Sequence, residues 1–257
     1  MGKVIAVANQ KGGVGKTTTG INLAASLART RRRVLLIDMD PQGNATVGSG
    51  VQKDDVEHTV YEVLLGQVSL SNAIVTTDSG YDVVPANSEL AGAQVELVNE
   101  QARERRLRGA LQPVREDYQY VLIDCPPSLN VLTVNALVAA DTVMIPMQCE
   151  YFALEGLTAL VNNIQKIRET LNPSLRIEGL LRTMYDGRNS LANEVSEQLR
   201  EHFGDKLYRT IIPRNVRLAE APGYGYPVIK YDQRCTGAQA YLALAGEVLR
   251  RDEATWQ

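Results

Sequence analysis

The sequence predicts a single α/β domain in which helices cover both faces of a doubly wound, mostly parallel sheet. Apolar runs alternate with helical patterns along all 257 residues, and this alternation implies right-handed crossovers between parallel strands. Several runs are apolar at every position, as strands buried on both faces are. Because only two Phe and one Trp are present, the core must be aliphatic, which argues against an aromatic-rich β-sandwich. No repeat, linker or composition break divides residues 1–257, so we expect one domain.

The elements follow from these patterns in chain order. Strands are expected at KVIAVAN (3–9), RVLLID (33–38), YDVVPA (81–86), YQYVLID (118–124), DTVMIPM (141–147), LRIEGLLRTMY (175–185) and LYRTIIP (207–213). Helical patterns predict helices at 16–29, 88–99, 102–112, 128–139, 155–170, 190–203 and 237–250. Residues 41–80, rich in Gly, Ser, Asn and Thr, are expected to form a mobile loop with short helices.

Composition and charge narrow the class of protein. The net charge of −3 gives no global attraction to nucleic acid or anionic lipid, so such binding would need a local patch. No apolar run approaches the ~18 residues of a membrane span, and a strand that begins by Lys3 leaves no room for a signal peptide. Cys125, Cys149 and Cys235 lie far apart without a C-x-x-C pair. We therefore expect a cytoplasmic protein with reduced thiols and no cysteine-bound metal.

The segment NQKGGVGKTT (9–18) follows the first strand and precedes the first helix, which is the setting of a phosphate-binding loop. In such a loop, backbone N–H groups and the helix N-terminus hold the anion. Lys16 would reach the β- and γ-phosphates, and the Thr17 hydroxyl would bind Mg²⁺. The spacing departs from G-x-x-x-x-G-K-T, since Gln10 stands at the first glycine position, and the loop carries a second lysine, Lys11.

Carboxylates stand at the ends of two other expected strands. VLLIDMD ends with Asp38 followed by Asp40, and YVLID ends with Asp124. An Asp at the carboxyl end of a strand beside the loop is suited to support Mg²⁺. Each could instead terminate a strand or cap a helix, but three together favour a nucleotide·Mg²⁺ site.

The segments KGGVGKTT, DMDPQGNAT, DCPPS, TMYDGR and IPRNVRLAEAP resemble the ParA/Soj family of chromosome- and plasmid-partitioning ATPases with a deviant Walker A loop. The resemblance runs nearly end to end. It implies a phosphate-loop ATPase that hydrolyses ATP to ADP and phosphate with Mg²⁺. The expected nucleotide contacts are Lys11, Gly12, Gly13, Val14, Gly15, Lys16, Thr17 and Thr18, with Pro213 and Asn215 at the adenine.

The same resemblance assigns the catalytic roles. Lys11 would cross to the nucleotide of a twin subunit in an ATP-sandwich homodimer and act there as an arginine finger does. Asp40 would position the attacking water. Asp124 would hold Mg²⁺ through water, and Asp38 would support the metal shell.

The resemblance also implies partners: non-specific duplex DNA and a ParB-type centromere-binding protein that stimulates hydrolysis, with the protein on the nucleoid. Arg188 and Arg217 match family positions that bind DNA, and residues 182–234 carry nine basic and seven acidic residues, a net +2. Relatives commonly have Gly-Lys-Pro where this chain has Gly225-Tyr226-Pro227, which weakens the patch. RTRRR (29–33) and RERRLR (103–108) are expected to be a helix-end turn and a solvated helix face.

Other classes remain open. A membrane-associated division-site ATPase should end in a basic amphipathic helix, whereas here Asp252 and Glu253 cancel Arg250 and Arg251. A redox ATPase with a shared cluster needs paired cysteines, a biosynthetic ligase needs no lysine in trans, and a structural DNA-coating protein would need no turnover. No membrane partner is expected.

Overall fold

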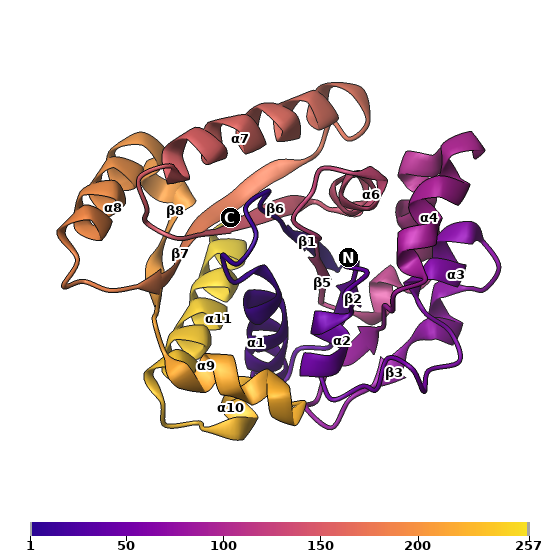
Figure 1. Ribbon diagram of the computed structural model, residues 1–257, viewed down its shortest axis with the longest axis horizontal. Coiled ribbons are helices and arrows are strands. Elements are labelled where there is room, and N and C mark those ends of the chain that lie inside the picture. Colours follow the sequence, from indigo (N-terminus) through magenta and orange to yellow (C-terminus); the bar gives the residue numbers. More distant parts are fainter. Residues whose placement is uncertain (1, 256–257) are drawn as a thin grey trace.

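The structure, a computed structural model, describes residues 2–255 and is built on one eight-stranded sheet (Figure 1). The strand order is β3-β4-β2-β5-β1-β6-β7-β8, and every pair is parallel except β3 with β4. The predicted doubly wound, mostly parallel sheet is therefore confirmed. The strands are β1 Lys3–Val7, β2 Val34–Asp38, β3 Val75–Thr76, β4 Asp82–Val84, β5 Tyr120–Asp124, β6 Thr142–Met147, β7 Arg176–Tyr185 and β8 Leu207–Pro213.

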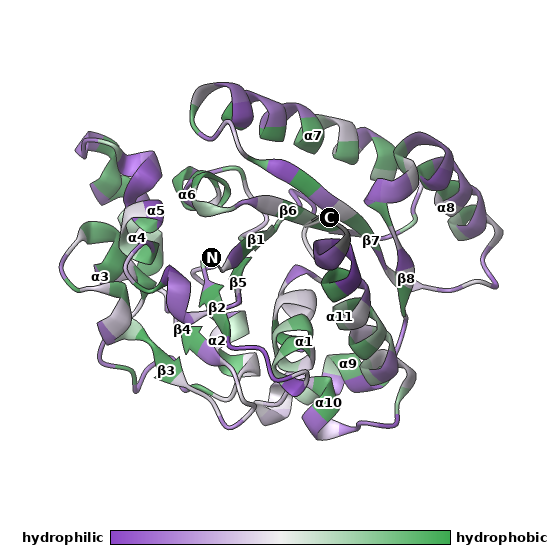
Figure 2. Ribbon diagram, turned by 180° about the vertical axis from the view of Figure 1, so that it is seen from behind, coloured by the Kyte–Doolittle hydropathy of each residue, from purple (hydrophilic) through white to green (hydrophobic). Residues whose placement is uncertain are grey.

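Helices cover both faces of the sheet (Figures 1 and 2). The α-helices are α1 Lys16–Arg29, α2 Asn44–Gly48, α3 Val60–Leu65, α4 Leu90–Glu96, α5 Arg106–Leu111, α6 Val131–Ala139, α7 Ala153–Thr170, α8 Ser190–Phe203, α9 Val216–Glu220, α10 Val228–Tyr231 and α11 Thr236–Thr255. Short 3₁₀ helices lie at Leu70–Ala73, Leu97–Asn99, Arg103–Arg105, Arg115–Asp117, Gly204–Lys206 and Ala221–Tyr224.

Successive side chains along each strand point to opposite faces of the sheet, and this alternation produces two hydrophobic cores, one on each face. Val4 and Ala6 of β1 pack with residues of α3 to α8, whereas Ile5 faces the opposite way and packs with α1 and α11. The same alternation holds in β2, where Leu35 and Ile37 join the first core and Leu36 the second. Burial on both faces explains why these strands read as continuous apolar runs.

The differences from the expected elements lie mainly in short pieces. The segment 41–80 contains α2, α3 and the strand β3, which pairs antiparallel with β4. The expected helix at 102–112 is a 3₁₀ turn followed by α5, and α11 extends to Thr255. The helices α9 and α10 stand where no helix was expected.

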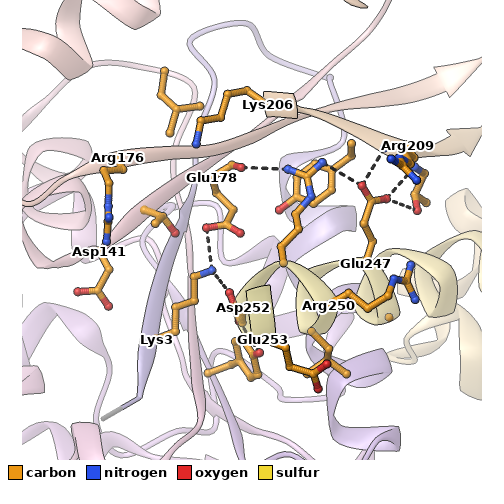
Figure 3. A pocket seen from close by; sticks show the side chains of 18 of the residues that line it. Lys3, Asp141, Arg176, Glu178, Lys206, Arg209, Glu247, Arg250, Asp252 and Glu253 are labelled. Carbon is orange, nitrogen blue, oxygen red and sulfur yellow. Dashed lines mark hydrogen bonds and ion pairs between the residues drawn. The ribbon is translucent and has the colours of Figure 1, made fainter. Parts of the chain in front are cut away.

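The base of the sheet, where the parallel strands begin, carries a polar network and a broad groove (Figure 3). Lys3 at the start of β1 binds Glu178 of β7 and Asp252 of α11. Arg251 of α11 binds Glu247, and its guanidinium lies over the ring of Tyr208. The groove has a volume of about 2060 Å³ and contains no phosphate-loop residue. These contacts fasten the end of the last helix to the first strand.

Among the described helices, none combines the length and the apolar character that a membrane crossing demands.

Candidate nucleotide-binding site

The predicted phosphate loop joins the central strand β1 to α1. The strand β1 has β5 on one side and β6 on the other, so the loop leaves the sheet where the chain order reverses, the usual place for ligands in such sheets. Gly13 and Gly15 adopt φ values of +71° and +83°, which favour glycine. Gly15 is the N-cap of α1, and no side chain caps that helix. Its first N–H groups are thus available to an anion.

Lys16 lies inside this loop. It is a buried side chain whose Nζ donates a hydrogen bond to the carbonyl oxygen of Lys11 at 3.1 Å. Burial lowers the pKa of Lys16, and the nearby carboxylates of Asp124 and Asp40 oppose that shift. A partly desolvated cation held at the start of a helix is well placed for a phosphate.

Thr17 and Asp124 meet beside Lys16. The Thr17 hydroxyl donates to Oδ2 of Asp124 at 2.7 Å, because β5 pairs with β1 and places Asp124 opposite Val7. The other carboxylate oxygen, Oδ1, is buried and has no hydrogen-bond partner among the described residues. Burial, followed by the charge of Asp38, raises the pKa of Asp124 well above its ordinary value. A hydroxyl and an unpartnered carboxylate oxygen are hard ligands of the kind that fits Mg²⁺ and its waters.

Asp38 is adjacent to Asp124 in the sheet but is already engaged. Its Oδ2 accepts hydrogen bonds from the N–H and the hydroxyl of Thr46 at 2.8 and 2.7 Å, and its Oδ1 accepts one from the Asp40 N–H at 3.1 Å. Complete burial raises its pKa to about 6. Asp38 thus holds residues 40–46 against the sheet, and Thr46, which the sequence reasoning missed, is its partner.

Asp40 follows on that segment and is partly exposed. Its Oδ1 accepts a hydrogen bond from the Gln42 N–H at 3.0 Å, and its charge acts on Lys16. The structure therefore brings five predicted site residues together at the carboxyl ends of β1, β2 and β5: Lys16, Thr17, Asp38, Asp40 and Asp124.

Lys11 points away from that group. Its Nζ lies 2.5 Å from Oε2 of Glu150, in the turn between β6 and α7, and both side chains are about half exposed. Tyr151 and Phe152 follow Glu150 and are largely exposed. The two lysines of the loop thus occupy different places: Lys16 is inside, and Lys11 is on the outer surface.

The strand β7 contributes a contact that the sequence did not reveal. The Thr183 hydroxyl donates to the carbonyl oxygen of Val14 at 2.8 Å. Beyond Thr183, Tyr185 pairs with Pro213 at the end of β8. Thr183 lies in TMYDGR, a segment that carried the resemblance, but its link to the loop needs the register of the sheet.

Asn215 lies just after β8 and is the N-cap of α9. Its Oδ1 accepts a hydrogen bond from the Arg217 N–H at 2.9 Å, and its Nδ2 donates to Thr236 at 2.8 Å. These two bonds use half of the hydrogen-bonding capacity of the side-chain amide. An adenine contact in this loop can use the remaining donor and acceptor of Asn215 or the backbone around Pro213.

The two arginines expected to bind DNA are exposed and ion-paired. Arg188 binds both oxygens of Asp186 at 2.9 and 2.7 Å, which lowers the pKa of Asp186 to about 2. Arg217 binds Glu220 at 2.8 Å and approaches Asp232 at 3.6 Å. Among the described residues, the side chains of the exposed Arg214 and Arg234 form no hydrogen bond or ion pair. Each expected DNA arginine thus carries a carboxylate that a phosphate would have to replace.

The sheet order, the glycine-rich loop and its lysine define a phosphate-loop nucleotide-binding protein. Residues 2–177 match a family model described as an AAA domain. The chromosome partitioning protein ParA of Caulobacter vibrioides is 55% identical over 97% of this chain and 95% of its own length. The sporulation initiation inhibitor protein Soj of Bacillus subtilis is 55% identical over 96% of this chain and 98% of its own. The chain therefore belongs to the ParA/Soj family of partitioning ATPases.

A solved structure shows the same fold with bound nucleotide. The structure of cobyrinic acid a,c-diamide synthase from Mycobacterium smegmatis with bound ADP and magnesium has a TM-score of 0.87 and 39% sequence identity. It covers 99% of this chain, which covers 97% of that one.

Proposed function

We propose that this protein is an ATP-driven switch that partitions DNA. ATP and Mg²⁺ bind at the phosphate loop, and two subunits close face to face around two nucleotides. The dimer binds duplex DNA without sequence preference, and a ParB-type partner stimulates hydrolysis and release. Family membership and the geometry of the loop support this proposal.

The residues divide the work by position. Lys16 and the free N–H groups of α1 bind the β- and γ-phosphates. Thr17 and Asp124 would hold Mg²⁺, which would neutralise charge on the phosphates. Asp40 orients the water that attacks the γ-phosphorus. Asp38 and Thr46 position Asp40, because they fix the segment that carries it.

The outward position of Lys11 carries the proposal. A lysine that belonged to its own nucleotide would lie with Lys16 inside the loop, whereas Lys11 reaches outward to Glu150. From the outer surface it is placed to reach the γ-phosphate of a facing subunit. Such a charge in trans contributes roughly 10³–10⁵ in rate in related phosphoryl transfers, so hydrolysis depends on the dimer.

The proposed DNA surface consists of the segments that follow β7 and β8. Arg188 lies in the loop after β7, and Arg217 lies in α9 after β8, close in sequence to the exposed Arg214. Because Asp186, Glu220 and Asp232 neutralise part of this charge, one subunit binds phosphates weakly, and two subunits are needed for a useful stripe. ATP then controls DNA binding through the monomer–dimer equilibrium.

Sedimentation with duplex DNA of random sequence tests the proposal directly. We expect co-sedimentation with ATP and Mg²⁺, and little with ADP or without nucleotide. Lys16→Ala is the control, because it removes the phosphate-binding charge and should abolish the ATP effect. DNA binding of equal strength with ATP, with ADP and without nucleotide would contradict the proposal of an ATP-driven switch.

The synthase relative makes biosynthetic ligation the second candidate. A ligase of that kind would stay in the supernatant whatever the nucleotide. The membrane-associated alternative is tested in the same way with anionic vesicles. Arg251 is paired with Glu247 in the structure, which leaves less positive charge on α11 for a membrane.

A further inference from the structure

Tyr224 and Tyr231 lie near Arg217, and a third tyrosine, Tyr226, belongs to the same stretch, residues 214–234. Tyr224 is 66% exposed and Tyr226 is 40% exposed. The ring of Tyr224 lies against that of Tyr231, with centroids 5.1 Å apart and planes inclined by 30°. Tyr231 donates a hydrogen bond to Glu220, the carboxylate that also binds Arg217. We call Tyr224, Tyr226 and Tyr231 the tyrosine cluster.

Positive charge accompanies the cluster. The Nζ of Lys230 lies over the Tyr226 ring, 4.4 Å from its centroid, and Arg234 is exposed on the same stretch. Residues 214–234 contain four basic residues against Glu220 and Asp232, a net charge of +2 within a chain of −3. The surface therefore combines cations with two exposed aromatic rings, those of Tyr224 and Tyr226.

Duplex DNA leaves such rings without a partner, because its base faces are stacked inside the helix. Unpaired bases expose their faces, and stacking on aromatic side chains combined with backbone contacts to cations is how proteins hold single strands. Tyr224 presents this arrangement: one side of its ring contacts Tyr231, and two thirds of the residue remains in solvent.

We propose that the tyrosine cluster binds single-stranded DNA, with a base stacked on Tyr224 and phosphates on Arg217 and Arg234. This deepens the proposed function, since Arg217 belongs to both surfaces. The protein then holds unpaired segments more tightly than its phosphate contacts alone allow. The tyrosine cluster prefers unpaired bases to paired ones and has little preference among base types.

The test compares three fluorescent probes with the same number of phosphates, by anisotropy in the presence of ATP: oligothymidylate, an abasic strand and a random duplex. Wild type should bind oligothymidylate more tightly than the abasic strand. Tyr224→Ala should weaken oligothymidylate binding roughly 5- to 150-fold, the range that corresponds to about 1–3 kcal/mol per stacked base. Duplex and abasic binding should stay unchanged. Tyr224→Phe, which keeps the ring, should bind as wild type does.

A salt series separates stacking from charge. Tyrosine neutralises no phosphate, so Tyr224→Ala should lower affinity at every salt concentration without changing the slope of log affinity against log salt. Equal affinity of wild type for oligothymidylate and the abasic strand would overturn the proposal, as would an equal loss for duplex in Tyr224→Ala. The partitioning proposal fails separately, if wild type does not bind duplex with ATP.

Discussion

Lys11 and Glu150 form an ion pair on the outside of the phosphate loop, and the proposed dimer must break it. Glu150→Gln releases Lys11, so the ATP dimer should form more readily. Each dimer breaks two such pairs, and exposed ion pairs contribute ~0.2–1 kcal/mol each. We therefore expect a dimerisation constant about 2- to 30-fold higher, measured by light scattering at a series of protein concentrations with ATP.

Glu155→Gln is the matched control, because it removes the same charge from an exposed site in the first turn of α7. Its dimerisation should equal that of wild type. If Glu150→Gln dimerises less readily than wild type, Glu150 supports the dimer instead of restraining Lys11.

Asp186 limits the charge that Arg188 offers to DNA. The Asp186 carboxylate is ionised at neutral pH and competes with phosphate for Arg188, whose pairing lowers the pKa of Asp186 to about 2. Asp186→Asn should raise duplex affinity and steepen the salt slope by up to ~2 per dimer, at ~0.9 per added phosphate contact.

Asp205→Asn controls for net charge in that experiment, since it removes an exposed carboxylate elsewhere on the chain. Equal gains in the two variants would show that overall charge, and not the release of Arg188, sets DNA affinity.

At the scale of elements, long buried strands could be predicted from the sequence and short pieces could not. The strands β1, β2, β5 and β6 have no polar face, so composition alone marks them. The helix α9 has five residues and depends on the Asn215 cap, and β3 has two residues that pair only because β4 lies beside them. Such pieces are set by tertiary contacts, which local patterns do not contain.

The candidate site divides in the same way. Lys16, Thr17 and Asp124 were predictable because each ends or begins an element. The Thr46 bond to Asp38, the Thr183 bond to Val14 and the Glu150 contact with Lys11 join segments far apart in the chain. No spacing rule relates those residues.

The phosphate loop contains one glycine at which a side chain can probe the proposed dimer without straining the backbone. A Cβ at Gly12 meets nothing within 4 Å, and Gly12 has no positive φ, in contrast to Gly13 with φ +71°. Gly12→Val should therefore bind ATP normally and remain monomeric with ATP. Light scattering with an ATP-binding assay checks both; an ATP dimer of this variant would contradict the face-to-face arrangement.

The helix α11 is fastened to the base of the sheet by Lys3. Lys3→Met leaves Glu178, whose side chain is 6% exposed, without its cation. We expect a loss of about 1–3 kcal/mol in the free energy of unfolding, measured by urea titration. Lys206→Met, an exposed lysine on the same groove, should be near neutral. Equal stability of the two variants would show that the network does not anchor α11.

For the whole molecule, DNA binding and nucleotide chemistry should be separable. Arg217→Ala changes an exposed side chain outside the phosphate loop. With ATP, the variant should therefore dimerise at the same protein concentration as wild type. Each dimer then lacks two arginine contacts to DNA phosphates. The slope of log affinity against log salt for random duplex should therefore fall in magnitude by up to ~2. Basal hydrolysis should survive while DNA enhancement of partner-stimulated hydrolysis disappears. An unchanged DNA-binding isotherm across the salt series would show that Arg217 does not bind DNA, and RTRRR (29–33) or RERRLR (103–108) would be the next candidates.

The contact between Thr183 and Val14 makes β7 a natural reporter of the loop. The next residue, Met184, adopts a φ of +47° and its sulfur accepts a hydrogen bond from Gln148 at 3.0 Å. The chain has only five methionines; Met39 adjoins Asp40, and Met144 accepts the Ala8 N–H beside the loop. A methyl NMR spectrum of isotope-labelled methionine would thus contain a few signals placed around the nucleotide site. Their shifts would follow each stage of the ATP cycle without an added probe.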